Sequence, residues 1–157
     1  MVRNALSLLE LNQLLAEVIE IGMPREYWVE AEISELRVVR GHCYIDLIEK
    51  TEGTNTPIAR ASAKCWQNTW SVISPYFEKV TGQRLCSGMN VLMLVSANFH
   101  PAYGFSWIIS DIDPTYTLGD MARKRQAIIE QLKREGVFDL QKELSLPLFC
   151  QHIAVIS

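Results

Sequence analysis

Three stretches of this sequence decide how the chain folds. They are residues 28–34 (Trp-Val-Glu-Ala-Glu-Ile-Ser), 41–49 (Gly-His-Cys-Tyr-Ile-Asp-Leu-Ile-Glu) and 58–66 (Ile-Ala-Arg-Ala-Ser-Ala-Lys-Cys-Trp). Each stretch alternates residue types with a period of two, which is typical of a half-buried β-strand. In the third stretch we expect the alanines and the cysteine to face inward. Its outward residues would then be two cations, a serine and an indole, a combination suited to binding a nucleic-acid strand (Arg60, Ser62, Lys64 and Trp66).

The same alternation predicts five strands in all. The first runs over 27–39, and the second and third correspond to the stretches already quoted. Further strands are expected over 89–98 and 103–112, joined by an aromatic turn at 99–104. The polar residues 51–57 are expected to form a hairpin loop between the second and third strands.

A capping box opens a helix near the N-terminus, where Ser7 is followed three residues later by Glu10. Gly22 and Pro24 end this helix. Its apolar residues recur at helical spacing and are expected to pack against the sheet, the alternative being a helix that binds a partner (Leu8, Leu11, Leu15, Val18 and Ile19).

Two more helices are expected. Residues 68–80 carry an apolar stripe, but Pro75 predicts that this helix is short, kinked or begins near Ser74. Its aromatic residues are expected to plug the core (Trp70, Tyr76 and Phe77). Residues 118–136 form a second amphipathic pattern, and its basic cluster is either a solvated face or a phosphate contact (Arg123, Lys124 and Arg125).

Several of these motifs resemble a known family. The residues at 28–34, followed by Gly-His-x-Tyr-x-x-Leu at 41–47, are similar to the N-terminal OB-fold domain of the exonuclease VII (exodeoxyribonuclease VII) large subunit, which usually has glycine at the place of Ala31. The resemblance continues through Ile-Ile-Ser-Asp-Ile-Asp-Pro at 108–114 and on to the last residue. It implies a mainly β fold, a five-stranded OB-fold barrel with an N-terminal helix, a helix between strands 3 and 4, and a C-terminal helix.

The resemblance also implies a domain organisation. Residues 1–115 are expected to be the OB-fold nucleic-acid-binding domain, and residues 116–157 a connecting helix and the truncated start of a nuclease domain. The runs Leu-Pro-Leu-Phe at 146–149 and Ile-Ala-Val-Ile-Ser at 153–157 would belong to that start. The parent hydrolase breaks single-stranded DNA down to oligonucleotides together with a small subunit. The present chain lacks that nuclease domain and is expected to be inactive alone, so whether it counts as an enzyme stays open.

Composition places the chain among globular proteins. It has 157 residues, of which 48% are hydrophobic and 21% charged, enough for one domain with a real core. No apolar run reaches the ~18 residues of a membrane helix, and there is no secretory signal pattern. We therefore expect a cytoplasmic protein that does not associate with a membrane.

The net charge of −3 argues against nucleic-acid binding when it is taken alone. The distribution weakens this objection, because residues 1–35 hold seven acidic and two basic residues, whereas 36–157 hold eleven and thirteen. Binding depends on the local face, so we expect binding, although weak binding for an acidic fragment.

The sequence offers no evident catalytic or metal site. Its four cysteines and three histidines do not pair at metal-ligand spacing, so we expect no cofactor and ordinary buried thiols (Cys43, Cys65, Cys86, Cys150; His42, His100, His152). Glu30 and Glu32 share one face and could bind a metal or act as acid and base. No third ligand lies nearby in sequence, so a solvated or salt-bridged pair is favoured, and DNA should avoid it.

The candidate nucleic-acid-binding residues come from the loops and outward faces that border the groove of an OB barrel. Arg37 and Arg40 lie at the turn between strands one and two, His42 and Tyr44 share a face of strand two, and three residues come from strand three. The aromatic turn adds base-stacking candidates, with packing of the hairpin as the alternative. The full set is Arg37, Arg40, His42, Tyr44, Arg60, Lys64, Trp66, Phe99, His100 and Tyr103.

We therefore expect a non-catalytic domain that binds single-stranded DNA through cations and stacked aromatic residues. A different class of function is an OB-fold module that docks the nuclease domain or another subunit. The resemblance implies the exonuclease VII small subunit as a partner through the parent enzyme. Steep weakening of binding by salt would favour DNA. An oligosaccharide-binding barrel is a further alternative, which titration with oligonucleotides would separate.

Overall fold

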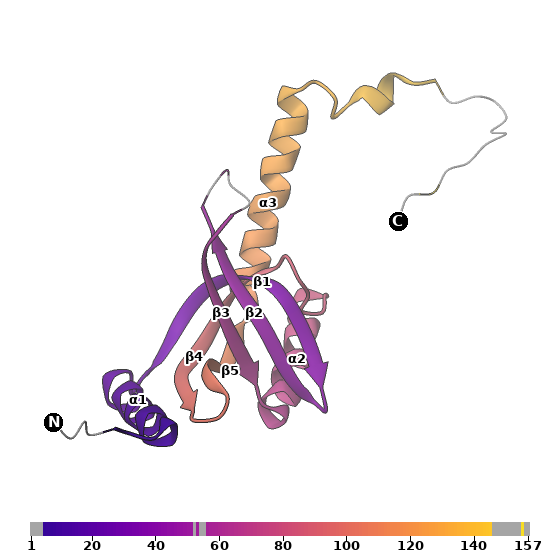
Figure 1. Ribbon diagram of the computed structural model, residues 1–157. Coiled ribbons are helices and arrows are strands. Elements are labelled where there is room, and N and C mark those ends of the chain that lie inside the picture. Colours follow the sequence, from indigo (N-terminus) through magenta and orange to yellow (C-terminus); the bar gives the residue numbers. More distant parts are fainter. Residues whose placement is uncertain (1–4, 52, 54–55, 146–154, 156–157) are drawn as a thin grey trace. The chain divides into compact units, whose positions relative to one another are not determined.

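The computed structural model describes residues 5–51, 53, 56–145 and 155. Five strands form a closed barrel in the order β1-β2-β3-β5-β4 (Figure 1). The elements in chain order are α1 (Leu8–Gly22), β1 (Glu26–Val39), β2 (His42–Lys50), β3 (Pro57–Cys65), α2 (Gln67–Thr81), β4 (Asn90–His100), β5 (Gly104–Asp113), α3 (Pro114–Arg134) and the 3₁₀-helix η1 (Leu140–Glu143). This confirms the expected five-stranded barrel with its three flanking helices. The chain divides into two compact units, Met1–Asp120 and Met121–Ser157.

Strand β1 is long enough to pair with two neighbours. Its first half, Glu26 to Glu32, pairs antiparallel with β4, and its second half pairs antiparallel with β2. The register between β1 and β2 shifts between Ile33 and Glu35, so a bulge separates the two halves. The barrel is closed by β3 and β5, which run parallel and pair only at Ala63 with Trp107 and at Lys64 with Ile108.

The barrel core is built from the inward positions that the alternation predicted. Ala63 and Cys65 are buried, as expected for the inner face of β3, but Ala61 is half-buried and Ala59 is exposed. The other buried residues come from β1, β2, β4, β5, α2 and the segment between α2 and β4, and together with Ala63 and Cys65 they form one cluster (Ile33, Cys43, Ile45, Leu47, Ile73, Phe77, Leu85, Val91, Met93, Val95, Ile109 and Ile112).

Helix α2 differs from the expectation in length and in one of its aromatic residues. It is continuous from Gln67 to Thr81 with Pro75 inside it, because the packing of its inner face compensates for the one backbone hydrogen bond that proline removes. Phe77 is fully buried and Trp70 packs against the core, as expected. Tyr76, expected in the core, is instead 55% exposed, because consecutive side chains of an α-helix point about 100° apart and Phe77 faces the core.

Helix α1 begins with the expected capping box, in which Ser7 N donates to Glu10 Oε2 (2.6 Å) and Glu10 N donates to Ser7 Oγ (3.2 Å). The expectation that its apolar stripe packs on the barrel is wrong for most of the stripe, since four of its members are exposed (Leu8, Leu11, Leu15 and Val18). Asn12 Nδ2 donates to the carbonyl oxygen of Pro101 at 2.8 Å, and the half-buried side of the helix is formed by Asn12, Ala16 and Ile19.

Helix α3 begins earlier than the pattern predicted, at Pro114, where proline suits the first helical turn. Its first turns belong to the barrel unit: Thr117 is buried and its Oγ1 donates to the carbonyl oxygen of Asn90 at 3.0 Å. In the second unit, Lys133 Nζ lies 5.5 Å from the centre of the Phe138 ring.

The runs expected at 146–149 and 153–157 lie outside the described residues, apart from Val155. No described helix combines the length and the apolar character that a membrane span requires.

Candidate nucleic-acid interface

A row of two cations around a tyrosine crosses the outer face of the barrel. The strand registers place Arg37 of β1 opposite Tyr44 of β2, and Tyr44 opposite Lys64 of β3. Directly opposed residues have Cβ atoms about 4.5–5.5 Å apart, so the three side chains leave the sheet together. Lys64 has no carboxylate within ion-pair distance in the described part of the chain, whereas Arg37 Nε contacts Glu35 Oε1 at 3.4 Å. Both partners of that pair are largely exposed, where ion pairs contribute little.

The turn between β1 and β2 extends this row with an arginine and two rings. Arg40 (φ 51°) and Gly41 (φ 83°) form a two-residue turn between the paired residues Val39 and His42, the geometry of a type I′ hairpin. The rings of His42 and Trp66 meet edge to face, with centroids 5.3 Å apart at 87°. Trp66 remains 46% exposed, so its other surfaces are accessible.

Helix α2 holds this turn in place. The backbone N of Gln67 donates to His42 Nδ1 at 3.1 Å, which in the neutral imidazole leaves the proton on Nε2. A Cβ atom on Gly41 would lie 2.8 Å from Cγ of Gln67, so glycine permits the close approach of the turn to the helix. We define Arg37, Arg40, His42, Tyr44, Lys64 and Trp66 as the turn cluster.

An acidic row limits the turn cluster on one side. Glu35 of β1, Asp46 of β2 and Ser62 of β3 are register partners, and Ser62 Oγ donates to Asp46 Oδ1 at 3.0 Å. Arg60 lies beyond this row, opposite Ile48. Arg60 and Lys64 therefore share one face of β3, as expected, but two carboxylates lie on the row between them.

The aromatic candidates of the β4–β5 hairpin form a second, separate group. His100 and Tyr103 have ring centroids 4.6 Å apart at 33°, and Phe99 pairs across the hairpin with Phe105. His100 Nδ1 accepts a hydrogen bond from Ala102 N at 3.1 Å. Tyr103 is 78% exposed, which suits stacking more than packing. We define Phe99, His100 and Tyr103 as the hairpin cluster.

Two further aromatic residues of β5, Phe105 and Trp107, lie near these candidates. The sequence pattern assigned them to a strand but did not identify them as candidates for binding. Phe105 and Trp107 meet edge to face, with centroids 5.1 Å apart at 86°. Phe105 is exposed and Trp107 is half-buried. The alternation of β5 grouped both with Ile109 but did not show which side of the barrel they face, and Ile109 is buried whereas these two rings are not.

Glu30 and Glu32 of strand β1 and the possible metal ligands can now be placed. Glu32 Oε1 pairs with Lys50 Nζ at 2.8 Å, so one of the two strand-one glutamates is salt-bridged as expected. No group of three potential metal ligands occurs among the described residues.

The described cysteines are not all buried, contrary to expectation. Cys86 is exposed, whereas Cys43 and Cys65 are buried register partners. Burial, with a contribution from Cys65, raises the pKa of Cys43 to about 12, and burial raises the pKa of Cys65 to about 11.

Comparison with known proteins identifies a family that this chain matches. The family model described as an OB-fold nucleic acid binding domain matches residues 6–113. The large subunit of exodeoxyribonuclease 7 from Deinococcus radiodurans is 38% identical over 157 residues, which cover 97% of this chain and 37% of the relative. Large subunits of the same name from Xanthomonas oryzae pv. oryzae (29% identical) and Xanthomonas axonopodis pv. citri (28% identical) match over 153 residues, 94% of this chain and 30% of each relative. The chain thus spans about a third of the length of these curated relatives.

Proposed function

This chain belongs to the family of OB-fold nucleic acid binding domains, and from that premise we propose that it binds single-stranded DNA with little regard to base sequence. The observation that carries the proposal is the row in which Arg37 and Lys64 flank Tyr44. Such a row places two cations, which can contact phosphates, on either side of a ring on which a base can stack. Proteins that bind single strands combine these two kinds of contact.

The turn cluster supplies the rest of the binding surface. Arg40 adds a third cation, and Trp66 adds a second ring whose exposed surface can stack a base. The neutral His42 directs its Nε2 proton away from Gln67, so it can donate to a phosphate or base oxygen. The acidic row at Glu35 and Asp46 repels phosphate. The DNA strand should therefore pass on the side of this row that is nearer to the β1–β2 turn.

We assign the hairpin cluster to a second stacking platform. Tyr103 is 78% exposed and would contact a base that extends beyond the turn cluster. Arg60 lies beyond the acidic row, and we expect it to contribute less than Lys64 does.

The proposal for the whole protein rests on the relatives named exodeoxyribonuclease 7 large subunit. We propose that residues 1–115 present single-stranded DNA to a nuclease domain. Residues 116–157 would connect the barrel to that domain and include its first residues. The complete protein would then be a cytoplasmic hydrolase of DNA catabolism that works with a small subunit. By itself this chain would bind DNA without cleaving it.

A second candidate function, a protein-docking module, is favoured by the exposed apolar residues of α1, among them Leu8, Leu11 and Val18. The two functions differ in their response to salt. Each phosphate contact to a single strand contributes about −0.7 to the slope of log affinity against log salt, so three cations predict a roughly twentyfold loss between about 50 and 200 mM salt. An apolar docking surface would show no such loss.

Fluorescence anisotropy with labelled single-stranded and double-stranded oligonucleotides of one length tests the proposal. We expect tighter binding to the single strand, weakened by salt as calculated. Equal binding to both forms, or binding that salt leaves unchanged, would contradict it.

The domain assignment has its own test, a variant ending at Ala122. It keeps the buried turns of α3 around Thr117 and should retain both cooperative unfolding and DNA binding. If the shortened chain no longer unfolds cooperatively, the C-terminal part is required for the barrel, and the proposed division is wrong.

A further inference from the structure

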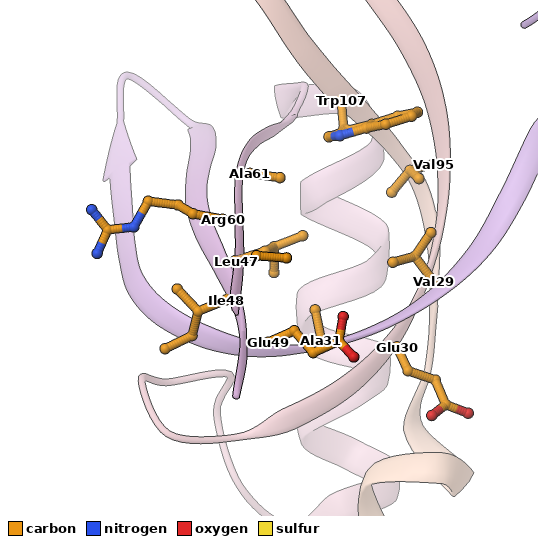
Figure 2. A pocket seen from close by; sticks show the side chains of 11 residues that line it. Val29, Glu30, Ala31, Leu47, Ile48, Glu49, Arg60, Ala61, Val95 and Trp107 are labelled. Carbon is orange, nitrogen blue, oxygen red and sulfur yellow. The ribbon is translucent and has the colours of Figure 1, made fainter. Parts of the chain in front are cut away.

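An apolar cavity of about 140 Å³ opens inside the barrel between β3 and the β1–β4–β5 side (Figure 2). Its walls are the side chains of Val29, Leu47, Val95 and Trp107, together with Ala61. The small residues of β3 leave this space unfilled, since a larger side chain in place of Ala61 would occupy it. An apolar cavity of about 150 Å³ accommodates benzene, so this one has room for a single aliphatic or aromatic side chain.

A free strand edge borders the cavity. Strand β3 runs from Pro57 to Cys65, yet it pairs with β5 only at Ala63 and Lys64. Within the described residues, positions 57–62 pair with β2 on one side and with no strand on the other. The backbone N–H and C=O groups of such an edge can pair with an added strand, a common way for sheets to bind extended peptides.

The mouth of the cavity is acidic. Glu30 and Glu49 line it, and Figure 2 shows the Glu30 carboxylate directed away from the apolar walls. Arg60 also lines the cavity, but its guanidinium points to the outer side of β3, away from the apolar walls. The neighbouring hollow shares both glutamates and adds Glu32, which is already paired with Lys50. This arrangement repels phosphate and attracts cationic side chains.

We propose that this opening is a docking site for an extended basic peptide segment of another protein or domain. The segment adds a strand to the free edge of β3 and inserts one apolar side chain between Leu47, Val95 and Trp107. Its lysine or arginine residues lie beside Glu30 and Glu49. The site is distinct from the turn cluster, so peptide and single-stranded DNA bind at the same time.

The probe is a short fluorescein-labelled peptide in which lysine alternates with valine around a central phenylalanine, and the control peptide carries glutamate in place of lysine. Anisotropy titration should show binding of the basic peptide only. Amide shifts in NMR spectra should then concentrate at 57–62 and 104–107, the two edges of the opening. An excess of unlabelled oligothymidylate should leave the bound fraction unchanged.

Three variants separate the cavity from a general charge effect. Glu30→Gln/Glu49→Gln should weaken peptide binding roughly tenfold, because each exposed ion pair between a glutamate and the peptide contributes about threefold. Glu17→Gln/Glu20→Gln removes the same charge from α1 and should have little effect. Ala59→Leu, at an exposed position that lines the cavity, should block the opening without disturbing the fold.

The proposal would be overturned by equal binding of the acidic and basic peptides, by equal loss in the two double variants, or by NMR shifts confined to other surfaces. Displacement of the peptide by oligothymidylate would also overturn it, because the opening would then belong to the DNA-binding surface.

Discussion

Replacing Phe77 with alanine tests whether α2 is an integral part of the barrel core. Phe77 is 0% exposed and packs in the cluster that includes Ile73 of the same helix. Removing its ring loses the transfer free energy of the buried atoms and leaves a cavity, so the free energy of unfolding should fall by about 3–5 kcal/mol. Domains of this kind are stable by about 5–15 kcal/mol, so the variant should still fold at 25 °C with a small reserve.

Urea denaturation monitored by tryptophan fluorescence measures this loss, since Trp70 of α2 packs against the same core. Tyr76→Ala is the matched control, because it removes a similar ring from the adjacent, 55% exposed position and should cost far less. Phe77→Leu keeps most of the apolar volume and should lie between the two. If Phe77→Ala and Tyr76→Ala lose the same stability, the burial described for α2 is wrong.

Three more predictions concern the turn cluster's support and the buried thiols. Gly41→Ala should lower the free energy of unfolding by about 1–3 kcal/mol, because the position combines a positive φ with a close contact to α2. Gly88 also has a positive φ but open space around it, so Gly88→Ala should lower the free energy of unfolding, measured by denaturation, by less. In a Cys150→Ser background at pH 8, a thiol reagent should label exposed Cys86 rapidly, and Cys43 and Cys65 only after unfolding; rapid labelling of all three would contradict their burial. Because burial raises the pKa of both thiols above 9.0, the folded state binds more protons, so stability measured by urea titration should fall as pH rises from about 9 toward 11.

The strands could be predicted from the sequence because each has one buried face. Alternation placed all five to within about two residues and identified the inward positions Ala63 and Cys65. The lengths of the helices were harder to predict from the sequence. Pro75 removes one local hydrogen bond, and only the packing of Phe77 shows that the helix continues through it.

The leucines of α1 illustrate a second limit. Their spacing correctly predicts an amphipathic helix, but periodicity does not say which surface meets the barrel. The half-buried side includes Asn12, whose hydrogen bond to Pro101 depends on a hairpin far away in the sequence. Leu8 and Leu11 are therefore exposed, although the pattern resembles that of a packed helix.

The candidate site could be predicted in part. Alternation correctly put His42 with Tyr44, and Arg60 with Lys64, on common faces. It could not show that Arg37, Tyr44 and Lys64 form one row, because register depends on turn geometry and bulges. The same missing information hid the acidic row between Arg60 and Lys64.

The most direct test of the DNA-binding claim is the salt dependence of single-strand affinity in Lys64→Ala. Lys79→Ala, which removes a cation from the last turn of α2, is the matched control. The parent slope of log affinity against log salt should be about −2, and Lys64→Ala should make it shallower by about 0.7, one phosphate contact, on every sequence tested. Lys79→Ala should leave the slope unchanged. A Lys64→Ala variant that unfolds like the parent and binds single-stranded DNA with the parent's affinity and slope would contradict the claim that this row is the binding surface.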